Sequence, residues 1–323
     1  MKKSNYIFVV VALFCFFFVK SATTPELPSL DKPLIFYSAQ DNLKNVFYSA
    51  IKKAKKSISL EIYGLSDISI LELLTAKALD GVAIQVHYDA GASNLPAKYL
   101  KPPIVLTQHK GKGLMHKKIL TIDESMVFIG SANMTTQSLK MHENLVLGIH
   151  KQELGTFLNT HKKESFTFEI GQQKLQFWPL PEPKAFDTLI SFINKAEKTI
   201  HVALFTLTHP LITDALIAAK NRGIKVRCAI DHYTGAGASK KQVERLKNAG
   251  VCLYLSQGIE LFHHKWALID KKILIHGSAN WTKAAFKDNK DCFIILENLD
   301  EKQKKFMKRI WKKIQYTSEE VCI

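Results

Sequence analysis

Residues 115–135 read MHKKILTIDESMVFIGSANMT, and residues 262–282 read FHHKWALIDKKILIHGSANWT. Both segments contain the pattern H-x-K-x4-D followed, at the same spacing, by G-S-x-N. Six fixed residues at fixed spacing arise by chance at any one start on the order of once in 10⁸. The fixed positions are His116, Lys118, Asp123, Gly130, Ser131 and Asn133 in the first segment and His263, Lys265, Asp270, Gly277, Ser278 and Asn280 in the second. The sequence therefore predicts a duplicated unit whose two copies fold alike.

The likeness extends outward from these two segments. Residues 51–67, IKKAKKSISLEIYGLSD, match residues 193–209, INKAEKTIHVALFTLTH, at an offset of 142 positions. The motifs themselves match at an offset of 147, so we place a small insertion in the second copy, near Lys240 to Asn248. A period this long indicates duplication at domain scale. We expect residues 22–160 to form the first repeat and residues 161–323 the second.

Periodicity predicts the same secondary structure in both copies. Helical spacing runs through residues 43–54, 68–79, 186–196 and 212–221. Apolar, β-branched runs typical of buried strands lie at residues 57–62, 84–88, 200–205 and 225–230. The alternation predicts an α/β fold with two tandem repeats, each a mixed, mostly buried sheet flanked by helices. The polar stretch around 161–173 is the predicted linker between them.

Strand geometry places the motif residues on defined faces. Because positions i and i+2 of a strand face the same way, His116 and Lys118 point together. Asp123 lies an odd number of residues from His116, so we expect Asp123 and Asp270, although part of the catalytic motif, to have supporting roles. The residues that follow each aspartate are typical of hairpin turns. Two such faces meeting across a pseudo-twofold axis predict one shared pocket.

The side chains of that pocket suit a phosphodiester. One neutral imidazole, from His116 or His263, can attack phosphorus while the other, protonated, donates to the leaving oxygen. Lysine and amide groups can stabilise the charge on the non-bridging oxygens. Lys118 and Lys265 are therefore predicted to be catalytic together with the histidines. The predicted phosphate-binding residues are Asn133, Asn280, Ser131 and Ser278, although the two serines fit equally well as turn residues. No cluster has convincing metal-ligand spacing, so neither a metal nor a cofactor is expected.

These motifs resemble the signature of the phospholipase D superfamily over nearly all of the chain after residue 21. The resemblance implies a covalent phosphohistidine intermediate, with His116 as the nucleophile and His263 as the acid and then the base. It also implies an acidic residue, shortly after G-S-x-N, that orients the opposite histidine. The candidates are Glu143, ten residues past Asn133, and Asp291, eleven residues past Asn280. One of these two assignments is therefore off by one residue.

Net charge and targeting signals bear on the substrate. The formal charge of +16 favours anionic partners: nucleic acid, anionic lipid or a phosphate-bearing substrate. The superfamily includes phospholipases, endonucleases and phosphatidyl transferases of the cardiolipin synthase type. Two motifs in one chain and a hydrophobic N-terminus favour a monomer that acts on phospholipids at a membrane surface, with nucleic acid as the alternative substrate. The basic segment 302–314 fits a membrane-bound helix, but packing on the core is the commoner outcome.

The N-terminus predicts export. Lys2 and Lys3 precede an apolar run from Tyr6 to Val19, which is short for a membrane span. We expect residues 1–21 to be a signal peptide, with an uncleaved anchor as the alternative, and the protein to be periplasmic, secreted or membrane-anchored. The remaining cysteines, Cys228, Cys252, Cys292 and Cys322, permit disulfides by their even number, but apolar surroundings favour buried free thiols.

Overall fold

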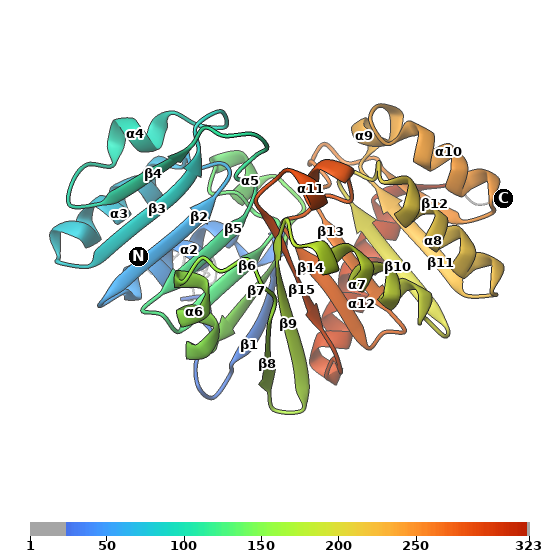
Figure 1. Ribbon diagram of the computed structural model, residues 1–323, viewed down its shortest axis with the longest axis horizontal. Coiled ribbons are helices and arrows are strands. Elements are labelled where there is room, and N and C mark those ends of the chain that lie inside the picture. The colour runs from blue at the N-terminus through green and yellow to red at the C-terminus, as the bar shows by residue number, and fades with distance from the viewer. Residues whose placement is uncertain (1–23, 322–323) are drawn as a thin grey trace, which may run out of the picture.

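The computed structural model describes residues 24–321, so the predicted signal segment and Cys322 lie outside the described residues. The chain forms two mixed β-sheets, each flanked by helices, that lie side by side (Figure 1). One sheet has seven strands and the other nine. All strands of the first sheet precede residue 160 and all strands of the second follow it.

The first sheet has the strand order β1-β7-β6-β5-β2-β3-β4. Its strands are β1 (Leu34–Ser38), β2 (Ser57–Ile62), β3 (Ala83–Asp89), β4 (Val105–His109), β5 (Lys118–Ile122), β6 (Met126–Gly130) and β7 (Leu145–His150). Strands β2, β3 and β4 are parallel, and the other pairings are antiparallel. The accompanying helices are η1 (Ala39–Asp41), α2 (Leu43–Lys53), α3 (Ile68–Leu79), α4 (Leu95–Tyr99), α5 (Thr136–Lys140) and α6 (Gln152–Asn159).

The second sheet has the order β16-β12-β11-β10-β13-β14-β15-β9-β8. Its strands are β8 (Phe166–Ile170), β9 (Gln173–Leu180), β10 (Thr199–Leu204), β11 (Lys225–Ile230), β12 (Cys252–Ser256), β13 (Lys265–Ile269), β14 (Ile273–Gly277), β15 (Asp291–Leu296) and β16 (Ser318–Val321). Its helices are α7 (Pro183–Asn194), α8 (Pro210–Asn221), α9 (His232–Ala236), α10 (Lys240–Asn248), α11 (Lys283–Lys287) and α12 (Glu301–Tyr316). Read from its other edge, the run β9-β15-β14-β13-β10-β11-β12 has the same order and the same strand directions as β1-β7-β6-β5-β2-β3-β4 of the first sheet.

The predicted α/β repeats are thus present, and two local departures are informative. Strand β8 occupies part of the stretch predicted as a linker, because Phe166, Phe168 and Ile170 pack against the core while Thr167 and Glu169 between them are exposed. Helix α10 occupies the predicted insertion, where the first repeat has only the short α4. Elsewhere the helices and strands begin and end within three residues of their predicted limits.

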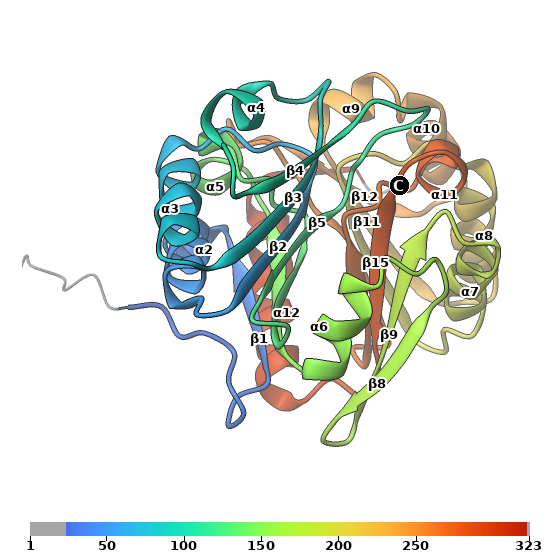
Figure 2. The ribbon, with the colours of Figure 1, turned by 60° about the vertical axis from the view of Figure 1, so that its left-hand side comes forward.

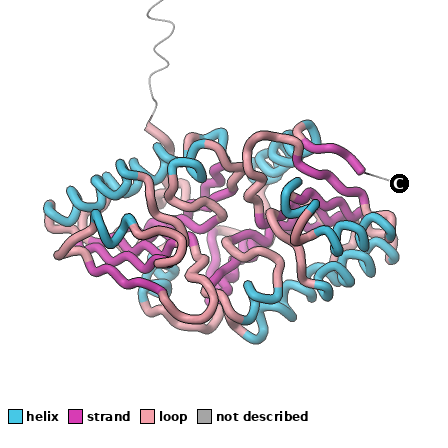
Figure 3. The backbone as a smooth tube through the Cα atoms, turned by 90° about the horizontal axis from the view of Figure 1, so that it is seen from above, coloured by secondary structure: helices cyan, strands magenta, loops and turns pink. Residues whose placement is uncertain are grey.

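An apolar layer joins the two sheets. It combines residues of the first sheet, such as Ile129 and Leu147, with residues of the second, such as Trp266 and Ile294. Strands β6 and β14 meet across the pseudo-twofold axis, and helices flank the strands of both halves when the molecule is seen from above (Figure 3). The two repeats are therefore held at a fixed relative position, which a shared site requires.

Helix α12 packs against this layer rather than presenting its apolar face to solvent. Met307, Ile310, Trp311 and Ile314 are buried in it. Phe306 on the same helix meets Phe36 of β1, with ring centroids 5.6 Å apart, and Figure 2 shows the helix beside that strand. This confirms core packing for the basic segment and leaves it no free apolar face for a membrane.

Two further observations concern export and redox state. Among residues 24–321, no helix is both long enough and apolar enough to cross a bilayer. Cys228 and Cys292 are free, buried thiols, whereas Cys252 is disulfide-bonded. Burial raises the pKa of the Cys228 thiol to about 12, so it is protonated and unreactive at neutral pH.

Candidate active site

Each motif histidine and lysine lies at the start of a sheet strand, on one face. Lys118 begins β5 and Lys265 begins β13, and each lysine Nζ donates a hydrogen bond to the backbone oxygen of its own histidine, at 2.6 Å for His116 and 3.1 Å for His263. All four residues are buried, between 1% and 6% exposed. The intervening Lys117 points to the other face, as the alternation predicts.

His116, from the first repeat, is held by the second. Its Nδ1 lies 2.9 Å from Oδ1 of Asp291, and its backbone N–H donates to the carbonyl of Lys290 at 2.8 Å. Ser278 donates its hydroxyl hydrogen to the same Asp291 oxygen at 2.6 Å. Because Asp291 accepts the Nδ1 proton, the lone pair of His116 is on Nε2.

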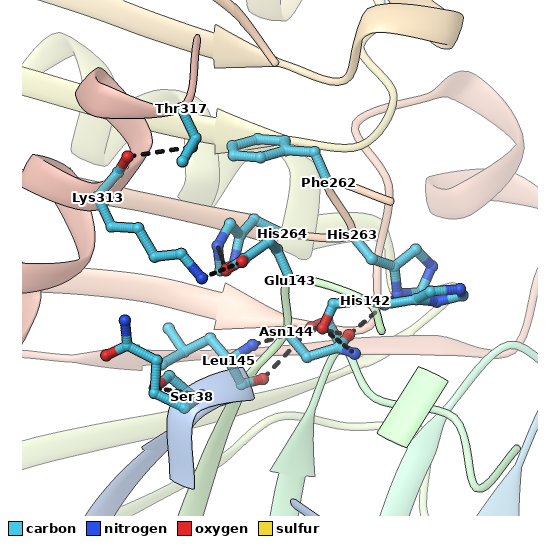
Figure 4. A network of polar contacts seen from close by, with 12 residues as sticks. Ser38, His142, Glu143, Asn144, Leu145, Phe262, His263, His264, Lys313 and Thr317 are labelled. Carbon is cyan, nitrogen blue, oxygen red and sulfur yellow. Dashed lines mark hydrogen bonds and ion pairs between the residues drawn. The ribbon is translucent and has the colours of Figure 1, made fainter. Parts of the chain in front are cut away.

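His263, from the second repeat, is held by the first, but by a neutral partner (Figure 4). Its Nδ1 lies 3.1 Å from Oδ1 of Asn144. The amide Nδ2 of Asn144 donates to the carbonyls of Ser138 and His142, at 2.8 and 3.3 Å. These two acceptors fix the amide with its oxygen towards His263, so the histidine carries its proton on Nδ1 and its lone pair on Nε2.

Asn144 takes the place that was predicted for Glu143. Glu143 points away from His263, forms an ion pair with Lys313, and has its other oxygen 3.9 Å from His264 (Figure 4). The prediction that Glu143 orients a catalytic histidine is therefore wrong by one residue. Asn144 lies 147 positions before Asp291, the offset of the motifs, but it is a neutral residue and does not match the acidic residue that the family resemblance implies.

The two motif serines support the histidine partners rather than the substrate. Ser131 and Ser278 are fully buried. Ser131 donates to Oδ1 of Asn144 at 2.8 Å and accepts from the backbone N–H of Leu145 at 3.1 Å, and Ser278 makes the equivalent contacts with Asp291 and Cys292. With donor and acceptor both in use and no exposed surface, neither hydroxyl can reach a phosphate, so the predicted phosphate-binding role of the serines is corrected.

The motif aspartates bind the backbone at the start of a neighbouring strand. They lie just after the ends of β5 and β13, whereas Lys118 and Lys265 begin these strands. Asp123 accepts the backbone N–H groups of residues 55–57 at 2.7–3.0 Å. Asp270 accepts those of residues 197–199 at 2.8–2.9 Å. Both residues have φ near +50° at the predicted hairpin turns. Their position agrees with the supporting role and excludes direct contact with substrate.

We expect Asp270→Ala to lower the free energy of unfolding by about 1–3 kcal/mol while changing kcat by less than about 3-fold, because three backbone N–H donors at the start of β10, which are partly open to solvent, lose a charged acceptor. Burial acts to raise the pKa of Asp270, but the backbone donors lower it overall, so its contribution to stability is present at neutral pH and is lost as pH falls through that lowered value. Urea unfolding between pH 3 and pH 7 measures the loss of stability and its dependence on pH, and a turnover assay measures kcat.

The exposed Asp31→Ala is the matched control and should leave stability unchanged. A large loss of kcat in Asp270→Ala at unchanged stability would contradict the supporting role.

Burial disfavours the charged forms of the two lysines and the two histidines. It lowers the pKa of Lys118 to about 7 and holds that of Lys265 well below its ordinary value. Burial also lowers the pKa of His116, although Asp291 opposes the shift, and it lowers that of His263 further, helped by Lys265 and Lys118. Since both lysines act on both histidines, the four groups share one electrostatic site. A bound phosphodiester would supply the negative charge that this site lacks.

Several residues that sequence reasoning left without a role complete the site. The ring of Tyr63 lies 5.1 Å from Lys118 Nζ, and the ring of Phe205, its equivalent in the second repeat, lies 5.2 Å from Lys265 Nζ. Asp89 and its equivalent Asp231 accept the backbone N–H of the residue before each histidine, at 2.9 and 3.3 Å. The constant offset of 142 between these pairs was the signal available in the sequence.

The motif asparagines lie at the edge of the site. Asn133 is half-buried and its Oδ1 accepts the backbone N–H of Gly64 at 3.2 Å, which leaves the Nδ2 donor for substrate. Asn280 is half-buried too, and its Oδ1 has no hydrogen-bond partner among residues 24–321. In the same motif, a Cβ on Gly130 would come within 2.4 Å of the Leu145 carbonyl oxygen, so only glycine fits there.

The chain is similar to several known proteins. A family model described as cardiolipin synthase, PLD-like domain, matches residues 47–164 and 189–316. The mitochondrial cardiolipin hydrolase of Xenopus laevis is 33% identical over 138 residues, which are 41% of this chain and 64% of that protein. A phospholipase D of Rickettsia conorii is 28% identical over 165 residues, covering 48% of this chain and 82% of that one.

The chain spans between about half and two thirds of the length of the cardiolipin hydrolases that it matches. Among solved structures, phosphatidylserine synthase of Haemophilus influenzae superimposes with a TM-score of 0.73 at 12% identity, covering 92% of this chain and 89% of that one. At this identity the superposition supports the fold alone.

Proposed function

Because the chain belongs to the family of cardiolipin synthase, PLD-like domains, we propose that it is a phospholipase D-type phosphodiesterase that hydrolyses or transfers the headgroup of a phospholipid. The observation that supports the chemistry most directly is the pair of buried histidines, each with its Nδ1 held by the opposite repeat and its Nε2 without a hydrogen bond within residues 24–321. The lipid substrate is supported by relatives named phospholipase D and cardiolipin hydrolase.

In the proposed reaction His116 is the nucleophile. Its Nε2 forms a bond to phosphorus while the bond to the leaving oxygen breaks, and His263 gives that oxygen a proton. The phosphorylated ring of His116 is positively charged for the lifetime of the intermediate, and the carboxylate of Asp291 stabilises it. Water then attacks phosphorus with His263 as the base, which restores the free histidine. An alcohol in place of water gives transfer.

The neutral partner of His263, Asn144, suits its proposed role as the acid that protonates the leaving oxygen. An imidazolium beside an amide is a stronger acid than one beside a carboxylate, and it gives up its proton more readily to a leaving oxygen. In the free enzyme, burial and the two lysines hold the pKa of His263 well below its ordinary value. The phosphodiester anion opposes the lysine charges, raises the pKa of His263 on binding, and makes the acid form available when it is needed.

Lys118 and Lys265 supply the positive charge that stabilises the non-bridging oxygens of the transition state. They are buried and flanked by the rings of Tyr63 and Phe205, so their charge acts in a medium that screens it little. The N-terminal segment predicts export, and we propose that the enzyme meets its lipid outside the cytoplasm, where its net charge of +16 favours an anionic membrane surface.

The full-length protein, in excess chelator, should release phosphatidic acid from mixed micelles of detergent and phospholipids, because lysines rather than a metal stabilise the transition state. Single-stranded DNA and RNA are offered in parallel, and glycerol is added in a further arm to detect phosphatidyl transfer. Mass spectrometry of the lipids and gel analysis of the nucleic acids identify the products, with His263→Asn as the inactive control.

Degradation of nucleic acid with every phospholipid intact would replace the proposed substrate by the nuclease alternative. Activity that chelator removes and only a divalent ion restores would refute the role given to Lys118 and Lys265.

A further inference from the structure

A second cluster of ionisable side chains lies on the face of β2 and β5 opposite the catalytic histidines. It consists of Glu61 on β2, His87 on β3 and His161, just after α6. One ligand atom from each residue lies within 4.8 Å of the other two. Glu61 and His87 are direct partners in the parallel pairing of β2 with β3, so their side chains leave the same face of the sheet side by side.

The carboxylate of this cluster is buried and already oriented. Glu61 is 5% exposed, and its Oε2 accepts a hydrogen bond from Lys117 Nζ at 2.9 Å. Its other oxygen, Oε1, lies 3.8 Å from Nδ1 of His161. Burial acts to raise the pKa of Glu61, but Lys117 and His161 lower it to about 2, so the group is an anion at neutral pH.

The two imidazoles lie on the solvent side of the cluster. Their rings are stacked with centroids 5.0 Å apart. The side chain of His161 is 39% exposed, so an ion can enter from solvent and a water can occupy a remaining coordination position. Burial lowers the pKa of His87, which keeps that ring neutral and able to act as a ligand.

The second repeat shows that the fold does not require polar groups here. The equivalents of Glu61 and His87, at the offset of 142, are Ala203 and Ala229, which are paired in the same register between β10 and β11. Both alanines are buried in the apolar layer together with Trp311 of α12. Glu61, His87 and His161 therefore place a charged, partly open cluster where the duplicated unit is otherwise filled by apolar side chains.

We propose that Glu61, His87 and His161 bind a divalent transition-metal ion of the zinc type, with water as a further ligand. Two imidazoles and one carboxylate are a ligand set that zinc accepts. Ligand atoms at about 2.0–2.1 Å from zinc lie about 3.4 Å from one another, so separations of up to 4.8 Å need to contract by at most about 1.4 Å, which the exposed His161 allows. Lys117 orients the carboxylate from outside the coordination shell.

Such an ion would tie the end of α6 to β2 and β3. Because the cluster faces away from His116 and Lys118, we assign the ion to stability of the first repeat and not to the phosphoryl chemistry. Turnover in excess chelator and zinc binding at this cluster are therefore compatible, provided that activity is measured well below the melting temperature.

The test uses full-length protein stripped with chelator and then titrated with Zn²⁺ alone. We expect about one tight equivalent by calorimetry and elemental mass spectrometry, and a rise in Tm of about 4–8 °C at 100 times the Kd. His161→Ala, at a partly exposed position that should fold normally, should weaken zinc binding by more than about 100-fold, since even outer-shell changes cost 10–100-fold, and should abolish the rise in Tm.

Two controls fix the location of the ion. The exposed His232→Ala should bind zinc as the wild type does. The double variant His116→Asn, His263→Asn should also retain its zinc and its rise in Tm. Zinc that is lost in this double variant but kept in His161→Ala would place the ion at the catalytic histidines and overturn the proposal, and so would the absence of any tight equivalent in the wild type.

Discussion

Replacing either catalytic histidine by asparagine is expected to reduce turnover by at least about 10⁴-fold, yet the two variants should stop the reaction at different steps. His263→Asn removes the acid and base but leaves the nucleophile. Given a phosphatidyl ester with a good leaving group, such as nitrophenol, it should therefore still form phosphoenzyme on His116 and fail to hydrolyse it. His116→Asn should form no phosphoenzyme, because no attacking imidazole remains.

The measurement is intact mass after rapid quenching without acid, followed by peptide mapping of the adduct. Both variants should fold normally, since asparagine is smaller than histidine and the site is polar. The exposed His232→Asn is the control for a surface histidine and should keep full activity. An adduct on His263 would reverse the two roles, and the absence of an adduct in both variants would indicate direct attack by water.

The sequence predicted the architecture and the reacting groups because both depend on repeated local patterns. The alternation of faces along β5 and β13 follows from strand geometry alone, and it placed His116 with Lys118 and set Asp123 apart. The constant offsets between the copies made the pairing of the repeats visible without any structure. Family resemblance then supplied the reaction type, which the geometry of the two histidines supports.

The residues that were misassigned depend on contacts between the repeats. Glu143 and Asn144 are adjacent, and only the turn after α5 decides which of them reaches His263 across the interface. The two motif serines were predicted either to bind phosphate or to act as turn residues, whereas in the structure they are fully buried and contact the backbone of β7 and β15. A local sequence pattern does not predict which side chains are buried where the two repeats meet, so only the three-dimensional structure could assign these residues.

The difference between Asp291 and Asn144 gives the second large expected effect. Asp291→Asn should reduce kcat/KM by about 10²–10⁴-fold, because the amide can donate to Nδ1 of His116 and so move the ring proton to Nε2, the atom that attacks phosphorus. The loss of the carboxylate also lowers the pKa of His116, since Asp291 opposes the effect of burial on it. Attack requires neutral His116, so the acid limb of the pH profile should move to lower pH.

Two further variants provide comparisons for Asp291→Asn. Ser278→Ala removes only the hydroxyl that donates to Asp291, so it should cost far less activity and keep the pH profile. Asn144→Ala removes the partner that holds His263 and should slow the protonation of the leaving oxygen. A substrate with a good leaving group, which needs little protonation, should largely restore the activity. The same leaving group should not rescue Asp291→Asn, because the nucleophile itself is impaired. If Asp291→Asn is rescued in this way, or keeps the acid limb of the wild type, then Asp291 does not set the charge of the attacking histidine, and His263 with its neutral partner becomes the nucleophile.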